Sequence, residues 1–251
     1  MRPAARAEWT KLRTLAGVRW LLPGLIAATV ALTAGATAVV DCTPAGCGSD
    51  PTELALVGVE LGQAVVAVLA VLVISGEYGS GTIRATLAAT PRRTTVLAAK
   101  TVTLTGVVAG AGAVAVLGSL WAGRLVLARR GHPALVPTEG PTLRAAAGSV
   151  LYLILVALLG LGIGTVVRDA AAATGIVLGL LYLLPLVSRA VGDPHWQRLL
   201  QQLGPMSGLA VRATTDLDRL PLRPWAGLGV TAGWAAAAIL LGGVRLHRRD
   251  A

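Results

Sequence analysis

The sequence has few charged residues. Asp, Glu, Lys and Arg make up 14% of its 251 residues, whereas 55% are hydrophobic, and phenylalanine is absent. A soluble chain of this length needs more charge to cover its surface. The hydrophobic residues also lie in long blocks, and blocks of about 18 or more such residues with few charges indicate helices that span a membrane. The composition therefore excludes an ordinary soluble domain and predicts an all-α, multi-pass membrane protein.

The sequence also lacks a recognisable catalytic or cofactor-binding set. Its three histidines lie in predicted loops and in the C-terminal tail, distant from any Ser or Cys that could act with them: His132, His195 and His247. Residues 76–83 read G-x-x-x-x-G-T-I, which is close to a phosphate-binding loop, but Thr82 stands where that loop needs its Lys. Because the missing cation makes the main contact with the β- and γ-phosphates, we expect no nucleotide on this chain. With no recognisable ligand set elsewhere, we also expect no other cofactor, apart from the metal-site alternative considered for the cysteines below.

Acidic residues are scarce, since 12 Asp and Glu stand against 22 Lys and Arg and give a formal net charge of +10. Such an excess can indicate nucleic-acid binding, but the sequence has no basic patch interleaved with aromatic residues and no recognition-helix pattern. Basic residues that flank membrane spans instead orient the chain and contact anionic headgroups. We therefore predict membrane lipid, and no nucleic acid, as a partner.

The hydrophobic blocks predict six spans within a single membrane domain over residues 1–251. The spans cover residues 18–40, 54–75, 101–123, 146–167, 171–189 and 225–244. Residues 1–17 precede them. In this first segment Trp9 and Leu12 belong to an apolar stripe at helical spacing, while Lys11 and Arg13 fall largely elsewhere on the helical wheel. The pattern is typical of a helix lying in the membrane interface, and the alternative is a disordered basic tail.

Two aspartates mark the starts of helices in the second half of the chain. Asp169 lies between the fourth and fifth spans, where it is placed to cap the fifth helix of a tight hairpin. In the longer loop that follows, Asp193 and Pro194 suit the N-cap and first position of a short helix that Gly204 would end. The apolar stripe of this helix, which includes Trp196, predicts that it is half-buried at the membrane surface or re-entrant.

Six spans place both chain ends on the same side of the membrane. Five basic residues come before or at the start of the first span, namely Arg2, Arg6, Lys11, Arg13 and Arg19. The loop after this span has no basic residue. Because the first helix usually sets the orientation, we predict both ends in the cytoplasm and the chain in a bacterial plasma membrane. Cys42 and Cys47 would then lie outside the cell, where a disulfide is favoured. Two free thiols, or a metal site that includes Asp41 and Asp50, are the alternatives.

The second predicted span contains two polar residues of interest. Glu60 is the only carboxylate well inside a predicted span, and Gln63 lies about one helical turn further along the same face. Ionisable groups in spans usually face the bundle interior or a polar cavity, so both residues are candidates for lining a translocation path. A structural hydrogen bond, or a side chain that reaches water near the outer surface, fits Glu60 equally well.

Glycine pairs at four-residue spacing occur in several predicted spans and would allow helices to pack closely. They are Gly58 and Gly62, Gly106 and Gly110, Gly160 and Gly164, and Gly175 and Gly179. Because the chain has 31 glycines, some of these pairs are expected by chance. They therefore indicate tight packing without identifying a particular contact.

The connection between the second and third predicted spans, residues 76–100, is longer than a simple loop needs to be. Gly81 permits a tight turn after the span, and Thr82 can cap a short helix. Ile83 and Leu87 would share one face of that helix. An amphipathic helix held between two spans at the cytoplasmic surface needs a partner to cover its apolar face.

Two stretches resemble the ABC transporter permeases of the type-2 exporter class, in particular those of actinobacteria. The first is EWTKLRTL at residues 8–15, and the second is GEYGSGTIRATLAATPRR at residues 76–93. The family pattern in the second stretch has an acidic–aromatic pair, Gly-Thr, a basic residue and Pro-Arg, which here are Glu77, Tyr78, Gly81, Thr82, Arg84, Pro91 and Arg92. The layout of spans is similar over nearly the whole chain, although LGPMSGLAV in the last outer loop matches only loosely.

The resemblance implies the membrane-spanning permease subunit of an ATP-driven exporter, working as a homodimer or as a heterodimer with a similar permease. In that family the segment at residues 76–93 contains a coupling helix that docks on a separate ATPase subunit, and the first helix packs against the same subunit. ATP would be bound and hydrolysed on that subunit, so this chain itself would not be an enzyme. The alternative is a membrane sensor or immunity protein that keeps the fold without transport. An ATPase encoded beside this gene would favour transport.

Overall fold

The computed structural model describes residues 9–11, 16–40, 50–79, 81–82, 93–129 and 139–248. All regular structure in these residues is helical. In chain order the elements are α2 (Ala16–Val39), α3 (Pro51–Ala55), α4 (Val59–Gly79), α6 (Arg93–Arg129), α7 (Gly140–Val167), α8 (Ala170–Leu178), the π-helix η1 (Gly179–Leu183), α9 (Leu184–Ala190), α10 (Pro194–Leu203), the 3₁₀-helices η2 (Pro205–Arg212) and η3 (Leu217–Arg219), and α11 (Pro224–Arg248).

Among the described residues, six helical segments are long and apolar enough to cross a membrane. They are Gly17–Val39, Val59–Gly79, Thr94–Arg129, Gly140–Val167, Ala170–Ala190 and Pro224–His247. Their number and order agree with the six predicted spans. The all-α, multi-pass membrane fold expected from the sequence is therefore confirmed.

The ends of several helices differ from the predicted spans. The second span was predicted from residue 54, but α4 begins at Val59, because Asp50 caps the separate short helix α3 and the chain turns at residues 56–58. The third was predicted over 101–123, whereas α6 covers 37 residues. A helix of that length measures about 55 Å and exceeds a hydrocarbon core of about 30 Å. Its charged ends interrupt the hydrophobic block without interrupting the helix, since Lys and Arg are good helix formers.

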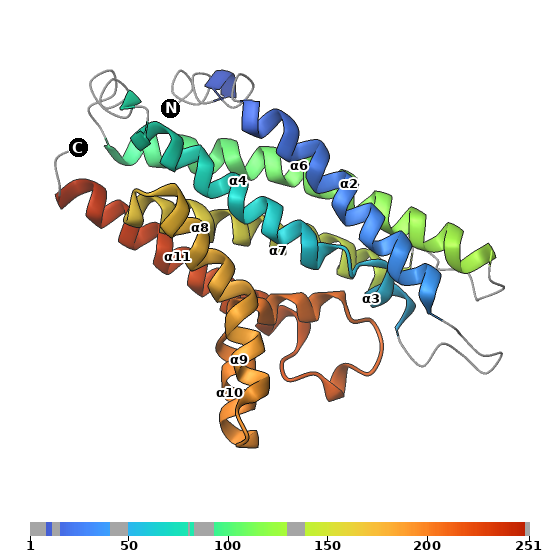
Figure 1. Cartoon of the computed structure of the whole chain (residues 1–251). Helices are drawn as coiled ribbons and strands as arrows, with labels where there is room; N and C mark the ends of the chain where they lie inside the picture. The colour runs from blue at the N-terminus through green and yellow to red at the C-terminus, as the bar shows by residue number, and fades with distance from the viewer. Residues whose placement is uncertain are drawn as a thin grey trace.

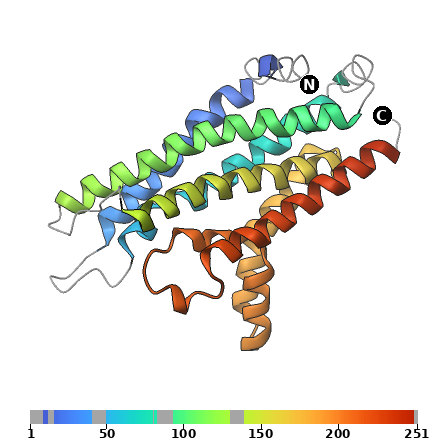
Figure 2. The ribbon, with the colours of Figure 1, turned by 180° about the vertical axis from the view of Figure 1, so that it is seen from behind.

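Five long helices, α2, α4, α6, α7 and α11, lie side by side in one bundle (Figures 1 and 2). The start of α2, the end of α4, the start of α6 and the end of α11 meet at one end, which we call the terminal end; α3 lies at the opposite end. The bundle is centred on α7, where Tyr152, Leu153 and Val156 have no exposed surface. This arrangement places the start of α2 and the end of α11 at the same end of the bundle.

Glycines allow α7 to touch two neighbouring helices on opposite faces. A Cβ added at Gly164 would lie 2.6 Å from the Ile74 side chain of α4, and one added at Gly162 would lie 2.5 Å from the backbone of Ala238 in α11. Of the four predicted glycine pairs, Gly58/Gly62 and Gly160/Gly164 lie at such helix contacts. A Cβ at either residue of Gly106/Gly110 or Gly175/Gly179 would meet no atom within 4 Å, so these two pairs are not packing contacts.

The fifth span consists of α8, η1 and α9 in succession. Asp169 caps α8 as predicted, because its carboxylate accepts a hydrogen bond of 2.7 Å from the backbone N–H of Ala172. The predicted short helix is also present as α10, with Asp193 as N-cap and Gly204 as C-cap. Together α9 and α10 form a hairpin that projects away from the bundle (Figure 1), and no residue of α10 is buried within the chain.

Candidate functional site

The predicted coupling segment starts from a group of charged side chains at the terminal end of the bundle. Glu77 in the last turn of α4 accepts hydrogen bonds from Lys100 of α6, at 2.7 Å, and from Lys11, at 2.8 Å, both through Oε1. The Lys100 side chain is only 1% exposed. Ion pairs of low exposure hold their positions more firmly than pairs in water, because water screens them less. Glu77 therefore joins the N-terminal segment, α4 and α6.

Tyr78, the next residue, makes a second connection at the same end. The Arg168 guanidinium carbon lies 5.2 Å from the centre of the Tyr78 ring, within the range of a cation–π interaction. Arg168 has a φ of 65°, in the left-handed region, where it ends α7 and turns the chain into α8. Such a conformation costs a non-glycine residue about 1–3 kcal/mol and persists where surrounding contacts hold it. The Tyr78 contact holds this corner against α4. We refer to Lys11, Glu77, Tyr78, Lys100 and Arg168 as the Glu77 cluster.

The coupling segment itself is described only at its two ends. Gly81 has a φ of 69°, so the predicted turn after α4 is present and requires a residue that tolerates the left-handed region. Both Gly81 and Thr82 are exposed. The other predicted coupling residues, Ile83, Arg84, Leu87, Pro91 and Arg92, lie outside the described residues, as do Leu12, Arg13, Cys42 and Cys47 of the other predicted sites. Their assignments stay predictions.

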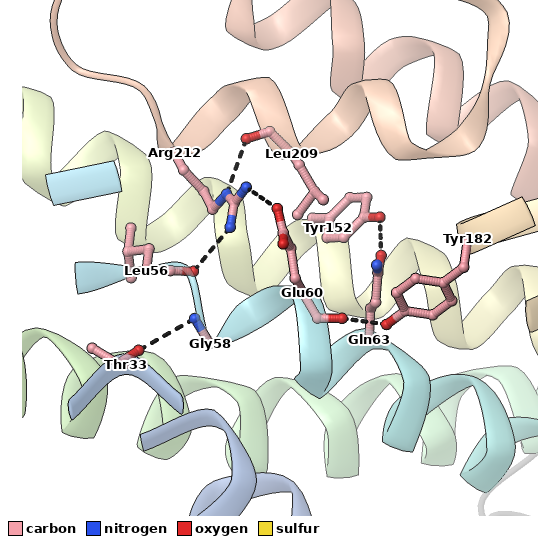
Figure 3. A network of polar contacts seen from close by, with 9 residues as sticks. All are labelled: Thr33, Leu56, Gly58, Glu60, Gln63, Tyr152, Tyr182, Leu209 and Arg212. Carbon is pink, nitrogen blue, oxygen red and sulfur yellow. Dashed lines mark hydrogen bonds and ion pairs between the residues drawn. The ribbon is translucent and has the colours of Figure 1, made fainter. Parts of the chain in front are cut away.

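A second polar group, drawn in Figure 3, lies around the start of α4, toward the end of the bundle where α3 lies (Figure 1). The Arg212 side chain, which is 6% exposed, donates a hydrogen bond of 2.8 Å from Nη2 to Glu60 Oε1. It also donates to the backbone oxygens of Leu56, at 3.2 Å, and Leu209, at 3.4 Å. Arg212 thus ties η2 to the first turn of α4. Glu60 itself is 41% exposed, so only one member of the pair is buried.

Gln63 and Glu60 do not share surroundings, although they lie one turn apart. Gln63 has no exposed surface, and its Oε1 accepts a hydrogen bond from the Tyr152 hydroxyl of α7. The Tyr182 hydroxyl of η1 donates to the backbone oxygen of Glu60 (Figure 3). The predicted path residue Gln63 is therefore an internal hydrogen-bonding group between helices. Glu60 remains the residue that faces open space.

That open space is a cavity of about 330 Å³ between α9, α10, η2 and residues 220–222. Glu60, Arg189 and Arg212 contribute charged groups to its wall, and leucines such as Leu200 and Leu209 contribute apolar surface. Small-molecule sites commonly have volumes of about 300–1,000 Å³ and combine an apolar lining with a few polar groups. The cavity can therefore admit a small amphipathic molecule beside Glu60.

Asp50, which the sequence offered as one carboxylate of a metal site, instead anchors the chain after η2. Its carboxylate caps α3 and accepts hydrogen bonds from the backbone N–H of Thr215, at 3.0 Å, and from the Thr214 hydroxyl, at 2.8 Å. Burial alone would raise the pKa of Asp50, but hydrogen bonds from Thr214, Thr215 and Glu53 outweigh it and hold the pKa below its usual 3.8. The stabilisation is therefore complete at neutral pH and is lost only as pH falls through this lowered pKa.

Sequence reasoning did not single out Lys100, Arg168, Arg212, Tyr152 or Tyr182 as site residues. Lys100 and Arg168 are basic residues that flank predicted spans, and Arg212 is one of several arginines in the loop before the last predicted span. A signal was present for Lys100, because it directly precedes a long apolar run and such a cation needs an acidic neighbour at the same depth. Arg212 is 152 residues from Glu60, and no local pattern connects them. In the described residues, no three His, Cys, Asp or Glu side chains lie close enough to hold a metal ion.

Comparison with known protein families gives one result. A family model described as "ABC-2 family transporter protein" matches residues 54–251, which is most of the chain. The matched residues include the Glu77 cluster, apart from Lys11, and the polar group around Glu60 and Arg212. No curated protein matches the chain.

Proposed function

The chain belongs to the ABC-2 family of transporter proteins, and from this premise we propose that it is the membrane-spanning subunit of an exporter driven by a separate ATPase. The Glu77 cluster is the observation that carries the proposal. It fixes the start of residues 76–93 to α6 and to the N-terminal segment. In the family that the sequence resembles, residues 76–93 and the first helix both contact the ATPase. A force applied to this segment therefore reaches α4 and α6 together.

Each cation of the Glu77 cluster connects the coupling segment to a different part of the protein. Lys100 is buried and belongs to a spanning helix, so its bond to Glu77 connects the coupling segment to the membrane domain. The Lys11 side chain is 37% exposed and belongs to the N-terminal segment, so its bond brings that segment to the same carboxylate. Arg168 holds the α7–α8 corner against Tyr78. Movement of the ATPase would thus be passed to three separate parts of the bundle.

The experiment that tests docking is Leu87→Asp. By sequence pattern Leu87 shares the apolar face of the predicted coupling helix with Ile83, and interfaces concentrate their energy in a few buried apolar side chains. Co-expression with the ATPase encoded beside this gene, followed by affinity purification of the permease, should therefore yield no co-purified ATPase for Leu87→Asp. Arg84→Glu should weaken co-purification by reversing a charge that pairs with the ATPase.

The matched control for this experiment is Leu203→Asp, which places the same charge on an exposed leucine of α10. It should leave co-purification unchanged, because α10 lies far from the terminal end of the bundle (Figure 1). If the basic residues of the segment only hold it against anionic lipid, Arg84→Glu will matter and Leu87→Asp will not. Full ATPase recovery with Leu87→Asp contradicts the docking proposal.

We also propose that two permease copies pair with two ATPase subunits. The mass of the purified complex tests this stoichiometry.

We further propose that the terminal end of the bundle faces the cytoplasm of a bacterium. The charge around the first span supports this orientation, and an ATPase that uses cellular ATP must dock on the same side. Cys42 and Cys47 should then react with a membrane-impermeant maleimide added to intact cells after reduction. The same reagent should give no further labelling after lysis. Labelling that appears only after lysis would contradict the orientation.

A further inference from the structure

A groove on the side of the bundle contains the glycine pair Gly106/Gly110, which makes no helix contact. The groove lies between α2 and α6, has a volume of about 640 Å³, and is bounded by Trp9 at the terminal end. Both glycines line it, and a Cβ added at either would meet no atom within 4 Å. Because both helices are spanning segments, the groove opens within the membrane, and its floor is smooth where side chains are missing.

Among the described residues that line the groove, Arg19 is the charged one, and no described carboxylate neutralises it. Arg19 lines the groove from the first turns of α2, and its side chain is exposed. In the described part of the chain no carboxylate lies within ion-pair distance of Arg19. A cation at the start of a spanning helix is stabilised by an anion at the same depth, and the guanidinium group suits a phosphate through paired hydrogen bonds.

Two tryptophans indicate that Arg19 lies at headgroup level. Trp9 borders the groove and is 49% exposed, and Trp20, the neighbour of Arg19, is 81% exposed. Tryptophan is enriched where the hydrocarbon core meets the polar headgroups. The groove therefore suits both parts of a phospholipid: Arg19, which has no carboxylate partner among the described residues, suits the phosphate, and the apolar channel suits an acyl chain.

We propose that the groove between α2 and α6 binds an anionic phospholipid, with its phosphate at Arg19 and an acyl chain over Gly106 and Gly110. The glycines have a definite purpose in this site, because any side chain there would occupy the space of the acyl chain. The second open pair, Gly175/Gly179, lines neither this groove nor the cavity beside Glu60. The site is separate from the Glu77 cluster and from the cavity beside Glu60.

The test uses the full chain in nanodiscs that contain equal amounts of phosphatidylglycerol and phosphatidylcholine. Native mass spectrometry after release from the nanodisc counts the lipids that stay bound to the protein. Wild-type protein should retain phosphatidylglycerol in preference to phosphatidylcholine. Arg19→Gln should lower that preference about fivefold, which corresponds to the loss of about 1 kcal/mol for one basic group near the membrane surface.

A second set of variants fills the groove and tests whether an acyl chain lies over Gly106 and Gly110. Gly110→Leu should remove the retained lipid of both headgroup types, because a leucine on a helix leans toward the N-terminus and here covers Gly106. Gly233→Leu in α11, also in open space, is the matched control and should retain lipid like the wild type. Gly106→Leu is a second filling variant should Gly110→Leu be poorly produced. Equal retention of both lipids by the wild type, or undiminished retention by the filling variants, overturns the proposal.

Discussion

Glu77→Gln is expected to lower the free energy of unfolding by about 3–5 kcal/mol, because it breaks the buried ion pair between Glu77 and Lys100. The Lys100 side chain is 1% exposed and cannot reach water to recover this loss. Lys100→Met should cost less, since Glu77 keeps its bond to Lys11. Thermal or denaturant unfolding of the purified protein in detergent measures both effects. Glu77→Gln should also reduce ATP-driven transport, because the coupling segment loses its connection to α6.

A double substitution tests whether the broken ion pair, and not another effect of the Gln side chain, causes the loss of stability in Glu77→Gln. If the broken Glu77–Lys100 pair is the cause, Glu77→Gln combined with Lys100→Met should restore much of the stability that Glu77→Gln alone removes. Glu53→Gln is the matched control, because it changes an exposed carboxylate at the opposite end of the bundle and should shift stability by no more than about 0.5 kcal/mol. A Glu77→Gln protein as stable as this control would show that the cluster does not hold the terminal end together.

At the opposite end, Arg212→Met is expected to lower the free energy of unfolding by about 2–5 kcal/mol. The substitution removes the charged donor from the backbone oxygens of Leu56 and Leu209, and a hydrogen bond from a charged group contributes about 1.5–3 kcal/mol. Glu60→Gln should cost less than about 1 kcal/mol, since Glu60 is partly exposed and its pair with Arg212 is screened on that side. Unfolding measurements on the two variants test this asymmetry.

The same pair of variants tests whether Glu60 belongs to the translocation path, as we propose from its position beside the cavity. Glu60→Gln should lower transport while leaving stability and ATPase co-purification close to the wild-type values. Transport that stays unchanged across several candidate substrates would assign Glu60 to a structural contact with Arg212. Equal destabilisation by the two variants would mean that the Glu60 charge, and not the burial of Arg212, dominates at this site.

The spans and caps of this fold could be predicted because their causes are local. Apolar blocks identify spanning helices wherever they lie, and Asp169 and Asp193 act on the next few residues of their own helices. The ends of α6 could not be predicted in this way. Lys100 reads as part of a polar connection until its partner Glu77, 23 residues earlier, is known to lie beside it.

Only part of the candidate site could be predicted, because the contacts between its residues join distant parts of the sequence. Glu77 and Tyr78 were identified through a motif, but the motif does not state what they contact. Glu60 was identified through its charge within a predicted span, whereas Arg212 becomes its partner only when η2 folds back against α4. Glycine spacing gave equal weight to four pairs, and only tertiary packing distinguishes a pair that joins helices from a pair that leaves a groove.

The glycine contacts of α7 also determine which part of the bundle can change shape. Gly162 and Gly164 hold α11 and α4 so closely that neither can slide along α7 without a collision of atoms. We therefore expect these three helices to shift together. The fifth span has no such restraint at Gly175 or Gly179, and it contains the π-turn η1. Relocating a π-turn by one residue rotates the segment it crosses by about 100°. Reorientation of the α9–α10 hairpin is thus the conformational freedom that this packing leaves open.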